Sequence, residues 1–372
     1  MSKRVATEAT GEGEDSLPPS TKAQRTDDSA DAATSASAAA VTEAPASPVR
    51  ERQSVGDGIR RRPPKKKVAA LIAYCGLPYQ GMQINPDCNS VELHLRDAFV
   101  KAEGIMQENA EKLQKVGWQR CARTDKGVHA AGQIISFKMQ MKEPETMVER
   151  VNSFLPEDIR LFGITKVTNS FNAKNMCGWR EYEYLLPTLA LRPSKAHPAH
   201  GEEWAFTAAV RQQVDGLLAR YVGTHNFHNF TKGSSWGDAS AKRFVMAFSC
   251  SESFEVEGVE FVRLTVRGQS FMFHQIRKMV AMMTMVVRDG APEDVIEACM
   301  GPADVNIPLV PGVNLMLRRC DFSMYEQKRG KEAPVVFPGT ENAVEEFIQK
   351  HVILPLAKLQ KTDKIMEEWL EY

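Results

Sequence analysis

From residue 68 onward, apolar and polar positions alternate with the periods of strands and amphipathic helices. The apolar run VAALIAY at residues 68–74 is short enough for a buried strand. Residues 90–104 place apolar side chains three and four positions apart behind Ser90, a typical N-cap residue, and this pattern predicts a helix. The same periodicities predict three more elements in this part of the chain: a strand at 134–139, a helix at 143–155 and a strand at 159–167.

A second series of strands and helices follows in a similar order. It begins with the strand-like segment EYEYLLPT at 181–188 and continues with a helical segment at 211–223. Two strand candidates then flank a turn at residues 257–258, and an apolar helix over 274–290 ends at Gly290, a typical C-cap. Strands and amphipathic helices that alternate twice predict an α+β fold with two similar halves.

Composition and pattern also suggest where the parts of the chain begin and end. The expected first half covers residues 68–176 and the second covers 177–330, followed by a peripheral helical extension at 331–372. Residues 1–67 form an expected disordered tail, because most of it has no aromatic residue with which to build a core. The tail ends in a basic run at 60–67, which is a nuclear localisation signal, a nucleic-acid contact or a solvated linker.

The overall composition indicates a soluble intracellular protein. Lysine plus arginine and aspartate plus glutamate both number 47, so the total charge by itself predicts no polyanionic partner. The 7 cysteines are spread singly, which argues against a disulfide framework and against a zinc ribbon. The chain has no apolar run near the roughly 18 residues of a membrane span, and its N-terminus lacks the apolar region of a signal peptide.

The segment QRCARTDKGVHA at 119–130 sets a single carboxylate among cations. Asp125 lies between Arg123 and Lys126, and Gly127 predicts a tight loop that displays it. A structural or solvated ion pair is the ordinary interpretation of such an aspartate. The dense run of polar residues just before a buried strand favours a functional interpretation.

Two tyrosines alternate in the strand-like segment REYEYLLP. Tyr182 and Tyr184 point to one face of the predicted strand, and Leu185 points to the other. Such a pair ordinarily packs in a core. It also offers flat faces on which a nucleobase stacks.

An arginine interrupts the long apolar helix of the second half. Arg277 follows Phe273 and His274 by one helical turn and lies on a face that should be inside. A buried guanidinium needs an anionic partner, and Asp125 is the candidate.

Two histidine pairs resemble metal motifs only superficially. His225 and His228, like His197 and His200, are three residues apart, but neither pair has a third ligand at a supporting spacing. No glycine-rich phosphate loop stands between a strand and a helix. We therefore expect no metal site and no nucleotide cofactor.

The segment CARTDKGVHA at 121–130 resembles the RTDxGVHA signature of the TruA family of tRNA pseudouridine synthases. Five more segments are similar to family segments and occur in the same order across residues 68–322: YCGLPYQGMQ, LPEDIR, REYEYLLP, GTHNFHNFT and GQSFMFHQIRKMV. The CARTDKGV form, the HNFHNFT block and the basic N-terminal tail most resemble the eukaryotic Pus1-type branch. The sister branch, which modifies the anticodon loop alone, is the alternative.

One segment departs from the family pattern. VPGVNLML at 310–317 has Val310 for an alanine and Asn314 for a glycine. Asparagine is the residue that best replaces glycine at a positive φ, so we expect Asn314 to keep such a backbone.

The resemblance implies an enzyme that isomerises uridine to pseudouridine in RNA without a cofactor. Asp125 matches the family nucleophile or base, and an ion pair with Arg277 is expected to lower its pKa and keep it ionised. Tyr182 matches the tyrosine that packs on the uracil and is a candidate to assist proton removal from C5. Arg123 matches the arginine that fills the gap left by the flipped base. Further substrate contacts are expected at seven positions: Lys126, Lys138, Arg180, Tyr184, Lys242, Arg243 and Leu315.

The implied fold joins the antiparallel sheets of two α/β halves into one continuous sheet, with the active-site cleft between them. The implied partner is tRNA, with small nuclear or messenger RNA as further candidates, and the implied state is a monomer. The nucleus is the expected location, with the cytoplasm and the mitochondrion as alternatives. Two rival functions remain: an RNA-binding homologue without catalysis, and a hydrolase that uses Asp125 but would need a second carboxylate.

Overall fold

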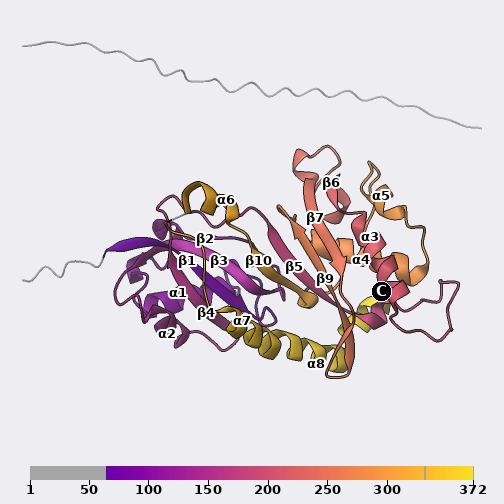
Figure 1. Ribbon diagram of the computed structural model, residues 1–372, viewed down its shortest axis with the longest axis horizontal. Helices are drawn as coiled ribbons and strands as arrows, with labels where there is room; N and C mark the ends of the chain where they lie inside the picture. Colours follow the sequence, from indigo (N-terminus) through magenta and orange to yellow (C-terminus); the bar gives the residue numbers. More distant parts are fainter. Residues whose placement is uncertain (1–63, 331, 372) are drawn as a thin grey trace, which may run out of the picture. The chain divides into compact units, whose positions relative to one another are not determined.

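The backbone is organised around one large β-sheet, shown in Figure 1. The computed structural model describes residues 64–330 and 332–371. The expected disordered tail therefore lies, up to residue 63, outside the described residues. Its last part does not: the first strand already begins at Lys65.

Ten strands form this sheet in the described part of the chain, in the order β4-β1-β3-β10-β5-β9-β7-β6, with β2 added to β3 and β8 to β9. The strands are β1 (Lys65–Tyr74), β2 (Gln119–Arg120), β3 (His129–Gln140), β4 (Ile159–Lys166), β5 (Arg180–Pro187), β6 (Gly223–Asn226), β7 (Lys242–Cys250), β8 (Phe254–Val256), β9 (Val259–Gly268) and β10 (Leu315–Cys320).

The last strand of the chain lies in the middle of the sheet. β10 runs antiparallel to β5 but parallel to β3, whereas every other pair of neighbouring strands among those described is antiparallel. Its parallel pairing with β3 is short and joins Met316 to His129 and Leu317 to Ala130. This junction connects the strands of the first part of the chain with those of the second.

Helices cover both faces of the sheet. The helices are α1 (Val91–Lys101), α2 (Met147–Asn152), α3 (Ala208–Ala219), α4 (Gln275–Asp289), α5 (Val295–Cys299), α6 (Ser323–Tyr325), α7 (Glu341–Ile348), α8 (Leu354–Thr362) and α9 (Ile365–Glu371). Short 3-10 turns lie at Gln107–Asn109, Leu113–Val116, Thr188–Leu191, His228–Phe230, Ala239–Ala241 and Gly312–Asn314, and π-helical turns lie at Glu326–Gly330 and Gln349–Ile353.

The larger core lies between one face of the sheet and helices α1 to α4. It contains Tyr182 and Tyr184 of β5 together with buried residues of all four helices, such as Phe99, Val151 and Leu217. The methionines of α4 are core filler here, because Met279 and Met283 are fully buried. Leu185, one residue after Tyr184, packs in a separate cluster on the other side. The predicted alternation along this strand is therefore confirmed.

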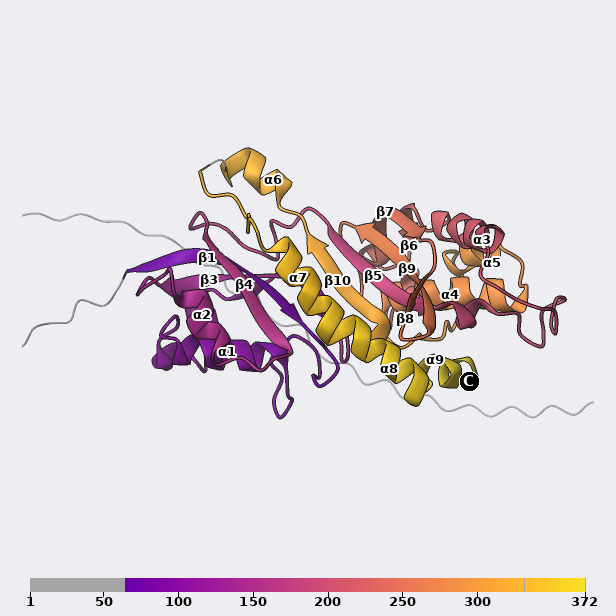
Figure 2. The same cartoon turned by 60° about the horizontal axis from the view of Figure 1, so that its bottom comes forward.

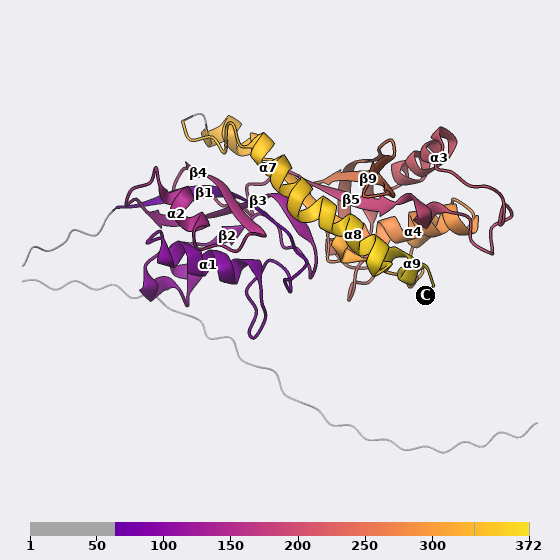
Figure 3. The ribbon, with the colours of Figure 1, turned by 90° about the horizontal axis from the view of Figure 1, so that it is seen from below.

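The C-terminal helices cross the opposite face. Phe347 and Ile348 of α7 and Leu356 of α8 share a buried cluster with residues of β1, β3, β5, β9 and β10. Figures 2 and 3 show this helical ridge running diagonally over the middle of the sheet. The expected peripheral extension is thus helical, but it packs against strands on both sides of the β3–β10 junction.

Most predicted elements are present, with differences at their ends. The Gly290 C-cap is confirmed by its left-handed backbone, with φ of 67°. β1 begins before the predicted strand because Lys67 is buried and its Nζ donates a hydrogen bond to Gly117 O at 2.9 Å. Burial and the charge of nearby Lys138 lower the pKa of Lys67 to about 8. An α+β chain with a large mixed sheet is confirmed.

Among the described residues, we find no helix with the length and apolar character that crossing a membrane requires.

Candidate active site

Asp125 lies in the loop that connects β2 to β3, close to the junction in the middle of the sheet. About 24% of its side chain is exposed. Val128 N donates a hydrogen bond to Asp125 O at 3.1 Å, and Gly127 has φ of 78°. The predicted tight loop is therefore confirmed, and it ends directly before β3.

Two glycines let a second loop pack tightly against the Asp125 loop. A Cβ at Gly76 would lie 2.2 Å from Val128 O, and a Cβ at Gly81 would lie 2.6 Å from Thr124 O. Met82 N also donates to Thr124 O at 3.1 Å. Any side chain at either glycine would push the loops apart, which explains the role of glycine in the YCGLPYQGMQ segment.

His129 ties together three segments around Asp125. Its Nδ1 accepts from Gly76 N at 3.0 Å, and its Nε2 lies 2.8 Å from Val313 O. Only the neutral tautomer with hydrogen on Nε2 satisfies both contacts. Burial lowers the pKa of His129 to about 4, so the ring is neutral near pH 7. No role for His129 was predicted, although it stands in the GVHA end of the signature.

Arg277 of α4 faces Asp125 without forming an ion pair with it. Its Nε donates to Val310 O at 2.7 Å, and the ion pairs of the described residues do not include one between Arg277 and Asp125. A Cβ at Gly312 would lie 3.3 Å from Cζ of Arg277 and 3.1 Å from Lys126 O. The backbone of Gly312 thus lies close to both the Asp125 loop and the guanidinium.

The electrostatic prediction for Asp125 was wrong in its net direction. Burial raises the pKa of Asp125, and the positive charge of Arg277 lowers it by less, so the pKa lies above its usual value. The reason is that the carboxylate has lost water without gaining a direct hydrogen bond from the guanidinium. Arg277 still favours the ionised form, but from a longer distance than predicted.

Among the described residues, His274 is the titratable side chain that lies within ion-pair distance of Asp125. Its Nε2 lies 3.9 Å from Asp125 Oδ2. Burial and the nearby cations, Arg277 first, lower the pKa of His274 to about 4, so a neutral imidazole faces the carboxyl group. Its ring stacks on Phe273 with centroids 3.6 Å apart, and 55% of Phe273 is exposed.

The backbone at His274 explains why sequence patterns did not reveal this residue. It is the N-cap of α4 and has φ of 68° in the left-handed region, which is costly for a residue with a Cβ. The helical periodicity places His274 on the helix, whereas its actual backbone turns the side chain toward the Asp125 loop.

The two tyrosines of β5 have different surroundings. Tyr182 is 8% exposed, and its ring meets Phe271 edge to face at 5.5 Å between centroids. Burial raises the pKa of Tyr182, so its phenol stays protonated at neutral pH. Tyr184 is fully buried and donates to Pro311 O at 3.0 Å. Tyr184 has no exposed surface in this state, and neighbouring Leu315 is only 6% exposed.

The predicted basic contacts also fall into different groups. Arg123 and Lys126 are exposed, and their side chains form no hydrogen bond or ion pair with the described residues. Lys138 is exposed but lies nine residues along β3 from His129, roughly 30 Å at the usual rise of a strand. Arg180 donates to the carbonyls of Cys121, Lys174 and Gln269, so three of its five donors are used within the protein.

A cleft opens beside His274. Its volume is about 750 Å³, and its wall includes His228, Asn229, Lys232, His274 and Lys278. Lys278 Nζ donates to Asn229 O at 2.9 Å and to Thr231 O at 3.1 Å, which fixes the HNFHNFT block against α4. The cleft wall therefore carries two lysines, neutral polar groups and the carboxylate of Asp304, and His274 joins it to the Asp125 loop.

Asn314 does not have the predicted positive φ. It lies in the 3-10 turn Gly312–Asn314, and its φ is not among the positive values of the described residues. Its side chain is buried instead: Nδ2 donates to Leu185 O at 2.6 Å, and Oδ1 accepts from Gln360 at 3.4 Å. The asparagine therefore serves as a link between β5 and α8.

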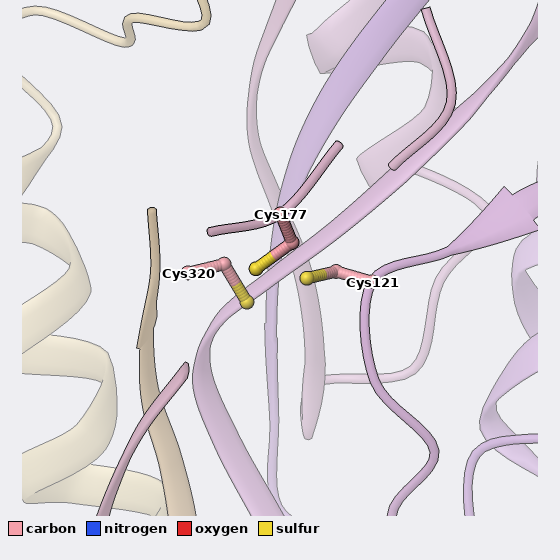
Figure 4. A group of neighbouring side chains, drawn as sticks. All are labelled: Cys121, Cys177 and Cys320. Atoms are coloured by element: carbon pink, nitrogen blue, oxygen red, sulfur yellow. The ribbon is translucent and has the colours of Figure 1, made fainter. Parts of the chain in front are cut away.

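The structure also brings together three cysteines that the sequence spaces far apart, as Figure 4 shows. The sulfur atoms of Cys121, Cys177 and Cys320 lie within 4.8 Å of one another. Burial raises the pKa of Cys121 and of Cys320, and hydrogen bonds to these two thiols lower that of Cys177. No spacing motif could have revealed this group.

Comparison with known proteins supports the resemblance seen in the motifs. A family described as tRNA pseudouridine synthase matches residues 217–323. The mouse pseudouridylate synthase 1 homolog is 39% identical over 316 residues, which cover 83% of this chain and 74% of the mouse protein. The human pseudouridylate synthase 1 homolog is 40% identical, with 82% of this chain and 72% of the human protein covered.

A fungal relative extends this similarity. The tRNA pseudouridine synthase 1 of Yarrowia lipolytica is 34% identical over an alignment of 382 residues. This alignment covers 80% of this chain and 72% of that protein. The similarity thus includes the Asp125 loop, the β5 tyrosines and α4, and it extends well beyond the segment matched by the family description. The chain belongs to the TruA-type family of tRNA pseudouridine synthases.

Proposed function

We propose that this protein isomerises uridine to pseudouridine in tRNA, with Asp125 as the nucleophile. The observation that carries the proposal is the state of the Asp125 carboxylate. It is partly exposed, and it forms no hydrogen bond with the described residues, while Arg277 and His274 face it from α4 and its N-cap. A buried carboxylate in a purely structural ion pair has its oxygens occupied by protein donors. Family membership supports tRNA as the substrate class.

The reaction breaks the bond between C1′ of the ribose and N1 of the uracil, turns the base and joins C5 to C1′. The proton on C5 is released and N1 regains one, so the product has the same atoms as the substrate. The ionised Asp125 carboxylate attacks, or stabilises positive charge at, the ribose when the glycosidic bond breaks. Arg277 assists by favouring the ionised carboxylate.

Tyr182 and Arg123 are proposed to hold the substrate. Tyr182 is buried beside Phe271, and a neutral phenol is better suited to packing on the uracil than to accepting its C5 proton. Arg123 is exposed and unpaired among the described residues, so it is free to enter the RNA helix when the uridine flips out. Lys126 is proposed to contact the backbone beside it.

A hydrolase is the less favoured function. Glycoside hydrolysis normally uses a second carboxylate within about 5–10 Å of the first. A neighbouring carboxylate would raise the pKa of Asp125 electrostatically, whereas among the described residues burial is the cause that raises it and Arg277 is the charged group that lowers it. The surroundings of Asp125 therefore support a transfer of the base within the enzyme.

The finer features of the proposal concern targets, state and location. We infer two similar halves with the RNA in the cleft between them, a monomer, and targets in the anticodon stem of tRNA, with small nuclear or messenger RNA as further candidates. The motifs that resemble the eukaryotic branch support these features. The nucleus is the proposed location, with the cytoplasm and mitochondrion as alternatives. The anticodon-loop enzyme of the sister branch is the alternative specificity.

The test measures tritium release from tRNA that carries uridine tritiated at C5. Wild type is expected to release tritium and to form pseudouridine, and Asp125→Asn is expected to do neither. Asp97→Asn, a change of a half-exposed aspartate on α1, is the matched control and should retain activity. Release of free uracil, or full activity in Asp125→Asn, would contradict the proposal. Mapping the modified positions by carbodiimide primer extension distinguishes anticodon stem from loop.

A further inference from the structure

Phe273 presents an open aromatic ring beside the candidate active site. It is 55% exposed, the largest value among the large apolar side chains of the described residues. One face of its ring is covered by His274, because the two rings stack with centroids 3.6 Å apart and planes 27° apart. His274 in turn lies 3.9 Å from Asp125, measured from Nε2 to Oδ2. The other face of the Phe273 ring is therefore exposed to solvent close to the Asp125 carboxyl group.

The segment that carries this ring is held by its own hydrogen bonds. Met272 N donates to Oε1 of Gln275 at 2.9 Å, and Thr231 Oγ1 donates to Phe273 O at 2.8 Å. His274 then enters α4 with φ of 68°, a backbone that is costly for a residue with a Cβ and is concentrated at functional sites. The two stacked rings are thus fixed before any ligand arrives, which lowers the entropic cost of binding to them.

Cations surround the stacked rings. Burial, followed by the positive charges of Arg277, Lys278 and Lys232, lowers the pKa of His274 to about 4, so all three cations lie near this side chain. Lys232 is exposed, and together with His274 and Lys278 it lines the cleft of about 750 Å³. Asp304 is the acidic side chain of the cleft wall, so the two lysines leave the wall with a net positive charge. This charge favours an anionic ligand.

A flat exposed ring with cations around it suits single-stranded nucleic acid. Bases of any kind stack on aromatic side chains, and lysines contact the phosphates of the backbone. A peptide or a lipid surface would need a wider apolar area. Phe271 and Met272, the apolar neighbours of Phe273 in the chain, are instead partly buried and pack against the core. The exposed apolar surface is therefore mainly one ring, which is the size of one nucleobase.

We propose that Phe273 stacks on an unpaired nucleobase next to the target uridine, and that Lys232 contacts the phosphate beside that base. The identity of the RNA rests on the proposed function, which this inference deepens. When the uridine flips toward Asp125, each of its two neighbours loses a stacking partner. One neighbour then stacks on Phe273, and the other is left to the guanidinium of Arg123. A substrate must therefore allow one base beside the uridine to leave its pair.

The first test measures the Kd of a tRNA transcript for the full-length chain in the Asp125→Asn background, where binding is measured without turnover. Phe273→Ala is expected to raise the Kd about 5- to 150-fold, the range for the loss of one base stack. Phe273→Leu should weaken binding to a similar extent, since its side chain is apolar but not flat, and Phe273→Trp should bind at least as tightly as the parent. Phe154→Ala, which removes a 46% exposed ring just after α2, is the matched control and should leave the Kd unchanged.

The second test identifies the stacked base. Hairpin RNAs carry an abasic ribose on the 5′ or on the 3′ side of a uridine that the wild type modifies. One of the two abasic positions should weaken binding to the chain with Phe273, and the same position should cost nothing further in Phe273→Ala, because the stack is already lost.

Several results would overturn the stacking role. They are an unchanged Kd in Phe273→Ala or Phe273→Leu, and losses from Phe273→Ala and from the abasic ribose that add at both positions. Abasic RNAs that bind the chain with Phe273 as tightly as intact RNA overturn it without any variant at this position, so a folding defect cannot hide the answer. Tritium release by the wild type tests catalysis separately. Release with an unchanged Kd in Phe273→Ala contradicts the stacking role alone, and a raised Kd without release contradicts the catalytic proposal alone.

Discussion

Two carboxylates of this protein lie near arginines, and their surroundings differ in kind. Glu92 of α1 is 1% exposed and accepts hydrogen bonds from Trp118, Ile84 and Arg120, with Arg120 Nη2 at 2.8 Å. Asp125 is partly exposed and has no hydrogen bond to its carboxylate from the described residues, and Arg277 does not reach it directly. The oxygens of Glu92 therefore accept hydrogen bonds from the surrounding protein, and those of Asp125 accept none from the described residues.

This difference separates a structural ion pair from a candidate catalytic group. Both carboxylates occur near arginine in the sequence, and Arg120 even stands in the same basic stretch as Asp125. The two carboxylates differ in how many hydrogen bonds their oxygen atoms accept. The buried carboxylate of Glu92 accepts four, and these stabilise the native state. A carboxylate kept short of donors retains the capacity to act on a substrate.

The largest expected effect is the loss of activity in Asp125→Asn. Tritium release should fall by at least about 10³-fold, because the nucleophile is gone. The melting temperature should stay close to that of wild type, because no hydrogen bond of the described residues depends on this carboxylate. A melting temperature that falls together with the activity would assign Asp125 a structural role like that of Glu92.

Glu92→Gln should show the opposite behaviour. Removing one partner of this buried pair leaves Arg120 uncompensated and should lower the free energy of unfolding by about 3–5 kcal/mol. Denaturation in urea measures the loss, and the activity of the folded fraction should be retained. Glu103→Gln, at an exposed pair with Lys142, is the control and should leave stability nearly unchanged. Equal effects in both variants would contradict the comparison.

Arg277→Gln should reduce activity by about 10–100-fold and also shift its dependence on pH. Arg277 lowers the pKa of Asp125, so its removal raises that pKa further. Because the ionised form of Asp125 is the active one, the rise of activity with pH should move to higher pH. The measurement is kcat/KM against pH for both proteins. An unchanged pH profile would mean that Arg277 acts on the substrate alone.

The remaining prediction concerns acid stability and His129. Its folded pKa of about 4 lies below the usual 6.5, so the stability it contributes is complete above pH 6.5 and is lost as the pH falls toward 4. This group should contribute roughly 3 kcal/mol to that loss. Urea denaturation at several pH values measures the slope, and His129→Gln should flatten it. A wild-type slope that persists in the variant would assign the effect to other groups.

Local patterns predicted much of the fold because their causes are local. The alternation along β5 correctly placed Tyr182 and Tyr184 on one face and Leu185 on the other, and Gly290 correctly predicted the end of α4. The start of β1 was missed because a run of lysines has no apolar pattern. Lys67 is buried, and Gly117 O, far along the chain, accepts its hydrogen bond.

The candidate site was predicted in part. The signature motif led to Asp125, and the apolar helix led to Arg277, because a polar residue in an apolar pattern is visible in sequence. The contact of His274 with Asp125 was not visible, since it depends on a left-handed backbone at the N-cap of α4. Arg277 does act electrostatically on Asp125, but the predicted direct contact is absent. The guanidinium donates instead to the carbonyl of Val310, and every residue has such a carbonyl.

The sequence by itself determined the elements, the loop that displays Asp125 and the family resemblance, since these depend on residues close together in the chain. Only the tertiary structure decided which oxygens stay free, that β10 lies beside β3, and that Cys121, Cys177 and Cys320 meet. The physical reason is that the hydrogen bonds of a buried group, and the meeting of side chains such as these cysteines, depend on segments far apart in the chain. Their proximity arises from the packing of the sheet and is not encoded in any local spacing.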